Sequence, residues 1–348
     1  MMNWRKPVAH VGKTAPKGAK RVLVIKLGAL GDFVQALAAA KLIRDYHVGA
    51  RITLLTTEPY KVLAERCPYF DVIEADGRPK EAQATAQLIA RIRNAKYDMV
   101  YDLECSGRTA NYYTAMRPWP PHWSGAAPRC SHPHANPDRD RLHPLDRYAD
   151  QLRYAGIGPE EGYAPGHAPM PDLSWVRAAM RDAPRMQAEY FGIRGPYVML
   201  LASAPGRPGE KGWSAKRIGE LAKRIAAQGV TPVAIGATDE KDICQGIADA
   251  EPRAKNLVSR TDHFQLATLA ERAAFVVGHD SGPMHIAAAA GAPCLTLFSG
   301  WVDVDRVTPR GRSGVAVIKA QPLEDLPAEQ VDQAIRNLGA YRAVAKVT

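Results

Sequence analysis

The chain lacks paired cysteines, a membrane-spanning segment and a secretory signal. Its five cysteines are scattered without CxxC spacing over 348 residues, which argues against a disulfide framework or a structural zinc site and favours a reducing compartment. No apolar run reaches the length that a bilayer requires. Residues 1–20 have neither the apolar core nor the cleavage site of a secretory signal. We therefore expect a cytoplasmic protein.

Acidic residues are too few to balance the basic ones, and the formal net charge is +10. A charge of this size calls for an anionic partner. Basic residues gather in 1–20, which we interpret as a flexible tail, and in 117–147. The tail has one aromatic residue, Trp4, and no nucleic-acid motif occurs, so we expect no nucleic acid as partner. A phosphorylated substrate or an anionic membrane face fits the charge.

Apolar runs alternate with helical patterns twice along the chain, which predicts an α/β protein with two doubly wound parallel sheets. The first series covers 21–180 and the second 190–325, with the boundary between 160 and 195 and a last helix in the C-terminal segment 326–348. The strands expected in the first series are 21–27, 52–56, 72–74 and 98–103. We also predict one helix over 173–190. Residues 118–145 are rich in Pro and His without a period, which predicts a long surface loop.

Gly28-Ala29-Leu30-Gly31-Asp32 follows the first apolar run and opens a helix. This places it at the carboxyl end of the predicted sheet, where open α/β sheets bind ligands. The segment is not GxGxxG, and no acidic residue about twenty positions on could hold a ribose, so it is a poor dinucleotide fingerprint. Asp32 is either a general base in the crevice or an N-terminal helix carboxylate that complements the dipole.

The stretch Phe275–Phe298 predicts strand, polar turn, helix and strand. Asp280 or Ser281 stands at the expected N-cap, and Pro283 fits the first helical turn. Such a helix start suits an anionic ligand, although an ordinary capped helix would have the same pattern. His279 and His285 flank Asp280 without a third ligand, so no metal site is expected. Ser281, His285 and Asp280 lie within one turn, which is wrong for a hydrolytic triad.

Two further loops of the second series carry charge. Ser203–Trp213 contains Arg207 and Lys211 and follows an apolar run. It is a candidate phosphate cradle, although it lacks P-loop spacing, and a basic surface loop is the alternative. Glu240 follows the apolar run 231–235. Its carboxylate is either a partner for ribose hydroxyls or an N-terminal helix acid.

Taken together, these elements resemble the glycosyltransferase family 9 heptosyltransferases over about residues 21–340. The resemblance rests on four ordered motifs: VLVIKLGALGD, PGRPGEKGWSAKR, IGATDEKD and VVGHDSGPMHIAAAAGAP. It implies a GT-B fold, in which two Rossmann-like domains face a central cleft. The acceptor would bind the N-terminal domain and the nucleotide-sugar donor the C-terminal one. A C-terminal helix would pack back toward the N-terminal domain.

The resemblance also implies an inverting transfer of heptose from ADP-heptose to a lipopolysaccharide inner-core acceptor, either Kdo or heptose. Asp32 would be the catalytic base. The donor would be held by six residues of the second domain: Lys211, Glu240, Asp280, Ser281, Gly282 and His285. We place the acceptor near Gly28, Gly31, Arg129 and Arg141. No cofactor would be required, with Mg²⁺ at most non-essential.

A lipid-linked anionic acceptor implies peripheral contact with the cytoplasmic face of the inner membrane. Two alternatives stay open. One is a GT-B enzyme that uses another nucleotide-sugar, or a sugar-nucleotide epimerase. The other is a non-catalytic nucleotide-sugar-binding protein, against which the presence of both Asp32 and Lys211 argues.

Overall fold

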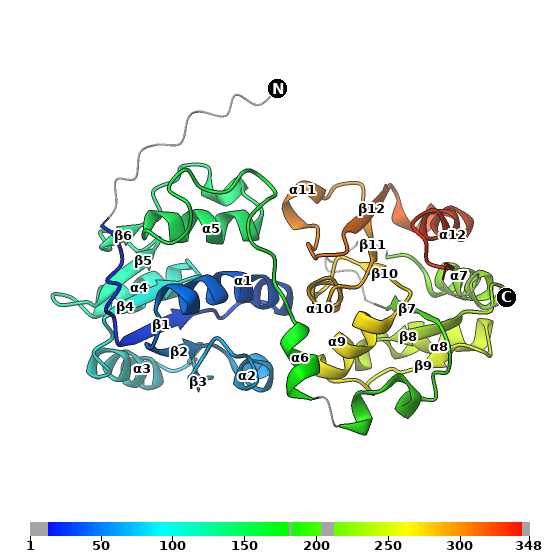
Figure 1. The fold of residues 1–348 in the computed structure, drawn as a ribbon, viewed down its shortest axis with the longest axis horizontal. Coiled ribbons are helices and arrows are strands. Elements are labelled where there is room, and N and C mark those ends of the chain that lie inside the picture. The colour runs from blue at the N-terminus through cyan, green and yellow to red at the C-terminus, as the bar shows by residue number, and fades with distance from the viewer. Residues whose placement is uncertain (1–12, 181–182, 203–211, 343–348) are drawn as a thin grey trace. The chain divides into compact units, whose positions relative to one another are not determined.

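The computed structural model describes residues 13–180, 183–202 and 212–342 (Figure 1). The chain divides into two compact units, Met1–Pro171 and Asp172–Thr348. The division lies inside the predicted boundary region, but residues 172–180 belong to the second unit and not to the first. Among the described residues, no helix is both long and apolar enough to cross a bilayer.

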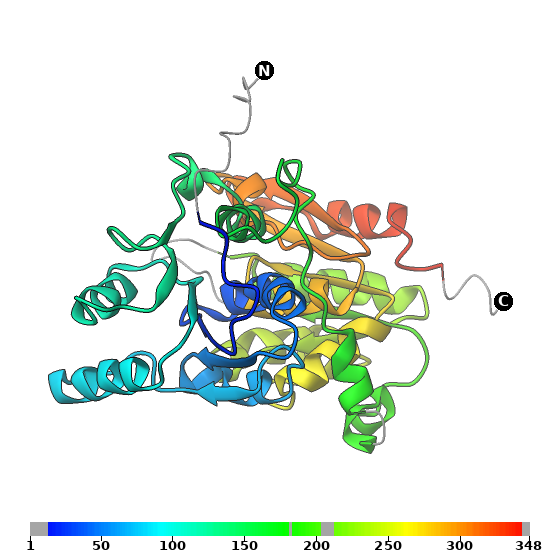
Figure 2. The same ribbon diagram turned by 60° about the vertical axis from the view of Figure 1, so that its left-hand side comes forward.

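The first unit is built on a six-stranded parallel sheet in the order β3-β2-β1-β4-β5-β6. Its strands are β1 Arg21–Ile25, β2 Arg51–Leu55, β3 Val72–Glu74, β4 Met99–Asp102, β5 His122–Gly125 and β6 His132–Pro133. Its helices are α1 Leu30–Tyr46, α2 Glu58–Glu65, α3 Ala82–Asn94, α4 Gly107–Ala115 and α5 Pro144–Tyr154. α1 and α5 pack against each other, as the blue and green helices in Figure 2 show.

Strand order in the first unit reverses between β1 and β4. The chain runs outward from β1 to β3 on one side and from β4 to β6 on the other. The central strands are apolar and buried on both faces, as parallel sheets covered by helices require. Leu23, Ile25, Val100 and Trp123 lie in the core of this unit. The loops after β1 and β4 therefore lie at a topological switch point, where such sheets bind ligands.

The second unit repeats this architecture with the sheet order β12-β11-β10-β7-β8-β9, again all parallel. Its strands are β7 Tyr197–Leu201, β8 Thr231–Ile235, β9 Lys255–Asn256, β10 Phe275–His279, β11 Cys294–Ser299 and β12 Val315–Ala320. Its helices are α6 Ser174–Ala179, α7 Ala215–Ala227, α8 Lys241–Ala250, α9 His263–Arg272, α10 Gly282–Ala290, α11 Val304–Val307 and α12 Ala328–Asn337. The switch point of this sheet lies between β7 and β10.

The prediction of a long loop over 118–145 is wrong. This segment contributes β5 and β6 to the sheet and a short 3₁₀ turn, Arg139–Arg141. Trp123 is fully buried, and His132 and His143 are also buried. Strands of four and two residues are too short to show a period in sequence. Pro133 is tolerated because β6 is an edge strand, where a missing amide breaks no central ladder.

The predicted helix over 173–190 is divided. It consists of α6 and two 3₁₀ turns, Pro184–Met186 and Ala188–Phe191. Pro184 accounts for the break, because proline lacks the amide that continues a helix and disfavours helical backbone in the residue before it.

The C-terminal helix is held within the second unit, and its packing toward the first domain stays a prediction. α12 packs against α7, and its side chains Val331 and Ile335 are fully buried in the core of the second unit. Leu326, just before α12, accepts a hydrogen bond from the Trp213 indole at 2.8 Å. α12 is therefore an integral helix of the second unit.

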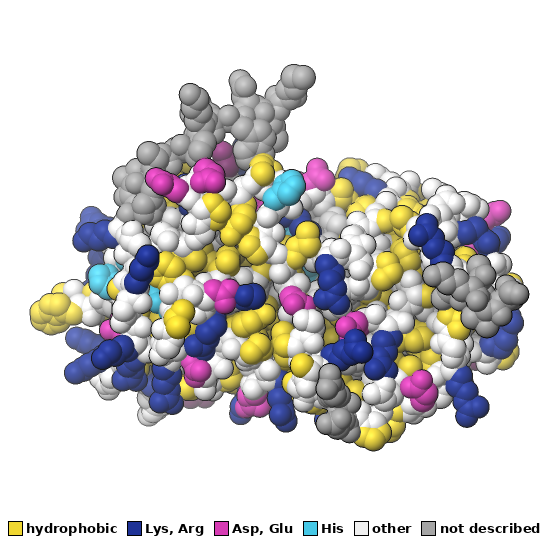
Figure 3. All heavy atoms as spheres, viewed as in Figure 1, with side chains coloured by type: hydrophobic (Ala, Val, Ile, Leu, Met, Phe, Trp, Pro, Cys, Tyr) yellow, Lys and Arg dark blue, Asp and Glu magenta, His cyan; other side chains and the backbone are white. Residues whose placement is uncertain are grey.

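Lys and Arg side chains are distributed over the visible face of both units, with a group of them over α3 (Figure 3). This agrees with the net charge of +10. Acidic side chains are interspersed among them, so the charge is a general property of the surface as well as of single loops.

Candidate active site

The switch point of the first sheet carries Asp32. β1 ends at Ile25, and the chain passes through Gly28 into α1, whose first turn contains Gly31 and Asp32. Both residues are partly exposed. The structure therefore confirms the position predicted for Asp32 at the carboxyl edge of the sheet, in the first turn of a helix.

Three charged groups converge on Gly28. A Cβ at this position would lie 2.9 Å from Lys26 Nζ, 3.2 Å from Glu104 Oε2 and 3.4 Å from Asp32 Oδ2. The backbone here has room for the three groups only because residue 28 has no side chain. Glu104 follows β4, so the adjacency of β1 and β4 brings it to the same place as Asp32.

Three hydrogen-bond donors bind the carboxylate of Glu104. It accepts hydrogen bonds from Lys26 Nζ at 3.0 Å, from the Leu27 amide at 3.1 Å and from Arg78 at 3.1 Å. Burial alone would raise the pKa of Glu104, but Lys26, the Leu27 amide and Arg78 outweigh it and the pKa is lowered. Burial likewise lowers the pKa of Lys26, and the surrounding Tyr148, Glu104 and Asp32 reverse this, so its pKa lies above the ordinary 10.5. Lys26 and Glu104 thus form a buried ion pair.

The predicted acceptor arginines are separated. Arg129 is exposed on the turn before β6, where Arg117 donates to the neighbouring Pro128 carbonyl. Arg129 thus belongs to the connection between β5 and β6, and Tyr113 donates a hydrogen bond to its carbonyl at 2.8 Å. Arg141 follows the carboxyl end of β6 and is largely exposed, 3.5 Å from Asp138.

Two arginines that the sequence reasoning did not single out lie near the switch point. Arg139 and Arg147 both lie close enough to Cys105, which follows β4, to lower the pKa of its thiol. Burial has the larger and opposite effect and raises this pKa to about 12. Asp102, at the end of β4, is fully buried, and burial raises its pKa to about 6. Together with Asp32, Lys26 and Glu104, the two arginines make the carboxyl edge of the first sheet strongly charged.

In the second unit, the turn after β10 opens α10 at the switch point. Ser281 is the N-cap and Pro283 lies in the first turn, as predicted, but the Ser281 side chain accepts no hydrogen bond from the helix. Its Oγ atom is buried and has no partner among the described residues. A helix start without a side-chain cap leaves its first amides, including that of Gly282, available to an anion.

Asp280 and His285 flank this helix start. His285 is 7% exposed, and its Nε2 lies 3.6 Å from Asp280 Oδ1. The Asp280 side chain keeps 37% of its surface exposed. The two side chains therefore present a carboxylate and an imidazole edge beside the amides of α10.

His279, the last residue of β10, anchors the loop that follows β7. Its Nε2 accepts a hydrogen bond from the Trp213 amide at 2.9 Å, and the buried Trp213 side chain is held in turn by Leu326. Lys211 lies outside the described residues, but it precedes this anchored point by two positions. Trp213 is thus tied to the strand that leads into α10.

Glu240 lies beyond the end of β8, as predicted. Its Oε2 accepts a hydrogen bond from the Ala237 amide at 2.7 Å. This contact stabilises the turn that begins α8, which is the structural role that the sequence also allowed. The carboxylate is partly exposed and lies at the same edge of the sheet as Asp280.

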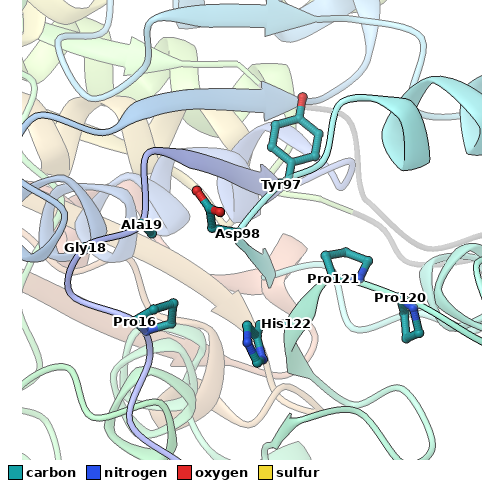
Figure 4. A pocket seen from close by; sticks show the side chains of 8 residues that line it. All are labelled: Pro16, Gly18, Ala19, Tyr97, Asp98, Pro120, Pro121 and His122. Atoms are coloured by element: carbon teal, nitrogen blue, oxygen red, sulfur yellow. The ribbon is translucent and has the colours of Figure 1, made fainter.

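Two other features do not form part of this site. Within the described ranges, no three His, Cys, Asp or Glu side chains are grouped closely enough to hold a metal ion. A hollow of about 350 Å³ lies at the amino edge of the first sheet (Figure 4). It touches the residues just before β1, β4 and β5, among them Ala19, Asp98 and Pro121. This edge is opposite to the one that carries Asp32.

Two doubly wound parallel sheets, each with charged side chains at its switch point, make up the GT-B fold of the solved heptosyltransferases described next. The chain belongs to glycosyltransferase family 9 (heptosyltransferase), whose model matches residues 85–330.

The lipopolysaccharide core heptosyltransferase OpsX of Haemophilus influenzae is 21% identical over 294 residues, which are 80% of this chain and 79% of that protein. E. coli ADP-heptose lps heptosyltransferase II superposes with a TM-score of 0.73 at 18% identity, over 94% of this chain and 100% of that one. E. coli heptosyltransferase WaaC, solved with ADP-2-deoxy-2-fluoro heptose, gives a TM-score of 0.69 at 19% identity, over 91% and 99%.

Sequence reasoning missed Lys26 and Glu104. One signal for Lys26 was present, because a lysine stands in the otherwise apolar run VLVIKL, where a buried charge requires a partner. Glu104 gave no such signal, since its proximity to Lys26 depends on the pairing of β1 with β4.

Proposed function

We propose that this protein is an inverting glycosyltransferase that moves a heptose from ADP-heptose to a lipopolysaccharide inner-core acceptor, either Kdo or heptose. Membership of family 9 supports the class of reaction. The donor analogue bound to the similar WaaC and the name of OpsX support the particular substrates. The observation that carries the proposal is the start of α10, with an unpartnered Ser281 hydroxyl beside Asp280.

The donor diphosphate would lie against this helix start. As the glycosidic bond to the leaving phosphate breaks, negative charge grows on the diphosphate, and a helix N-terminus with aligned donors stabilises such charge. The Ser281 hydroxyl, the Gly282 amide and His285 are the groups there, and we assign Lys211 the role of an added cation. Asp280 would accept hydrogen bonds from the heptose hydroxyls, and Glu240 from the ribose.

The acceptor hydroxyl would lose its proton to Asp32. A carboxylate in hydrogen-bond reach of an attacking hydroxyl supplies general-base catalysis. The anionic groups of the acceptor require cations near this base, and we assign this role to Arg139 and Arg147, which act on Cys105 after β4, in addition to Arg129 and Arg141. Gly28 and Gly31 leave the backbone beside Asp32 open to close approach.

We propose that transfer needs no metal ion, because the helix start and Lys211 supply the positive charge that a metal would otherwise provide. Transfer rates unchanged by EDTA are the expected result, and a strict requirement for Mg²⁺ would overturn this part. We also propose a cytoplasmic location with peripheral contact to the inner membrane, since the acceptor is lipid-linked.

The proposal is tested by calorimetric titration of the purified protein with ADP-heptose, ADP-glucose, UDP-glucose and GDP-mannose, followed by transfer to core acceptors with mass-spectrometric detection. We expect tightest binding of ADP-heptose, and a product heavier by one heptose.

Ser281→Ala should weaken ADP binding, because a donor to the diphosphate is lost, while Ser174→Ala on α6 is a matched control. Preference for a UDP- or GDP-sugar would identify another glycosyltransferase. Donor binding without transfer to any acceptor would indicate a binding protein.

A further inference from the structure

Lys26 is a buried cation whose role the donor and acceptor assignments leave open. Its side chain is 5% exposed, although lysine is almost never buried without a partner. Its backbone continues the sheet beyond β1, where the Lys26 amide donates to the Leu55 carbonyl at 3.0 Å. Burying an ion pair costs desolvation free energy that its attraction often fails to offset. Stability alone is therefore a weak reason for a lysine here.

The ammonium is fixed in place by Glu104. This carboxylate is tied to the Leu27 amide and to Arg78 as well as to Lys26, so it cannot follow Lys26 if the lysine moves. Two strands thus determine the position of the ammonium, β1 through the backbone and β4 through Glu104. A side chain whose backbone and terminal charged group are both fixed is suited to orienting an adjacent functional group.

That neighbour is Asp32. Its Oδ2 and the Lys26 Nζ both lie within 3.4 Å of the point where a Cβ of Gly28 would stand. Glu104 reaches the same point, and two carboxylates at one place repel each other unless a cation compensates one of them. Lys26 and Arg78 provide this compensation for Glu104. The ammonium also attracts the Asp32 carboxylate directly, and this attraction depends on Glu104 only because Glu104 fixes the position of the ammonium.

Among the described residues, helices α5 and α2 bring the phenols Tyr148 and Tyr60 to Lys26, and the Arg147 guanidinium lies 5.5 Å from the Tyr148 ring centroid. Tyr148 of α5 has its ring centroid 5.8 Å from the Lys26 Nζ, and its hydroxyl is buried without a partner among the described residues. Tyr60 of α2 stacks on Phe33, the residue after Asp32. Among the charged groups identified around Lys26, only Asp32 is both partly exposed and not tied down by another pair.

We propose that Lys26, held by Glu104, is a positioning residue that fixes the carboxylate of Asp32 for proton abstraction from the acceptor hydroxyl. The inference rests on the proposed role of Asp32 as base. Lys26 takes no part in the proton transfer itself and does not contact the donor. Its effect is on the geometry of the base, and misplacing a catalytic group by about 1 Å can cost about 100-fold in rate.

The test compares Lys26→Met, Lys26→Arg and wild-type protein in the transfer assay. We expect Lys26→Met to lower kcat roughly 10- to 100-fold, with KM for the donor unchanged because donor binding is assigned to the second unit. Lys26→Arg keeps the charge and should retain more activity than Lys26→Met. Lys41→Met is the matched control, since Lys41 forms an exposed pair with Asp45 on the same helix as Asp32; it should leave kcat unchanged.

A second variant separates positioning from simple loss of a buried pair. Lys26→Met leaves Glu104 with Arg78 as its remaining cation, which weakens the compensation of a buried carboxylate. Lys26→Met with Glu104→Gln removes both charges and so removes that destabilisation. If positioning by the ammonium matters, the double variant stays low in kcat although its melting temperature recovers. Recovery of kcat together with stability would overturn the proposal, as would equal kcat for Lys26→Met and wild type.

Glu104→Gln alone covers the case in which Lys26→Met does not fold. This variant frees the ammonium while keeping the shape of its partner, and it should lower kcat without changing donor KM; wild-type kcat would contradict the positioning role. Failure of the underlying function is recognised separately, because wild-type protein would then transfer no heptose at all.

Discussion

The bond between His279 and Trp213 allows a quantitative prediction about the second unit. In His279→Ala, the Trp213 amide loses an acceptor at 2.9 Å in a part-buried position, and leaving a buried donor unsatisfied costs about 1–3 kcal/mol. For a unit of this size, each kcal/mol lowers the melting temperature by roughly 2–4 °C. The anchor of the segment that carries Lys211 is lost at the same time, so ADP should bind roughly 2- to 10-fold more weakly.

Differential scanning calorimetry and titration with ADP measure the two effects on one preparation. His279→Asn retains an oxygen acceptor and should lie between wild type and His279→Ala. His167→Ala is the control, because His167 is exposed in the first unit and its ring contacts the nearby Pro165 carbonyl at 3.1 Å. If His279→Ala melts and binds ADP like wild type, the anchoring of this segment by His279 is refuted.

Three further predictions concern single positions. Asp102 has a pKa raised to about 6 from 3.8 by burial, so its contribution to the free energy of unfolding falls as pH rises between these values, by up to about 3 kcal/mol. Asp102→Asn should therefore gain stability relative to wild type from pH 4 to pH 7 in urea titrations, and a constant difference would contradict this. Ile335→Ala should cost about 2–5 kcal/mol in calorimetry, because Ile335 is fully buried in the core of the second unit; a loss below about 1 kcal/mol would mean that α12 is not part of that core. Gly28→Ala places a methyl group 2.9 Å from Lys26 Nζ, so it should lower the rate of transfer while ADP binding persists. Gly18→Ala is the control, because a methyl group there has no atom within 4 Å, and it should change neither property. Equal transfer rates for the two variants would show that the space at Gly28 is not needed.

Secondary structure was predictable where apolar runs are bounded by turn residues. β8 at Thr231–Ile235 and β3 at Val72–Glu74 have the predicted bounds. β12 at Val315–Ala320 was missed, because it is a partly exposed edge strand with little buried surface to mark it. β5 and β6 were missed because Pro and His hide two very short strands in a segment without periodicity.

The candidate site was predictable only where it is local in sequence. Asp32 and Ser281 each follow an apolar run and begin a helix, so their place at the carboxyl edge follows from the βα order. Glu104 reaches Lys26 across 78 residues of sequence, which only the strand order determines. Arg129 lies on the connection between β5 and β6, and its role in acceptor binding stays a prediction.

The role of Asp32 as the base is tested most directly by Asp32→Asn, with transfer of heptose and binding of ADP measured on the same protein. The substitution keeps the size of the side chain and removes its ability to take a proton. The account predicts a fall in kcat of about 10²- to 10⁴-fold with ADP affinity unchanged, because the donor is assigned to the second unit. Near-normal turnover by Asp32→Asn would contradict it.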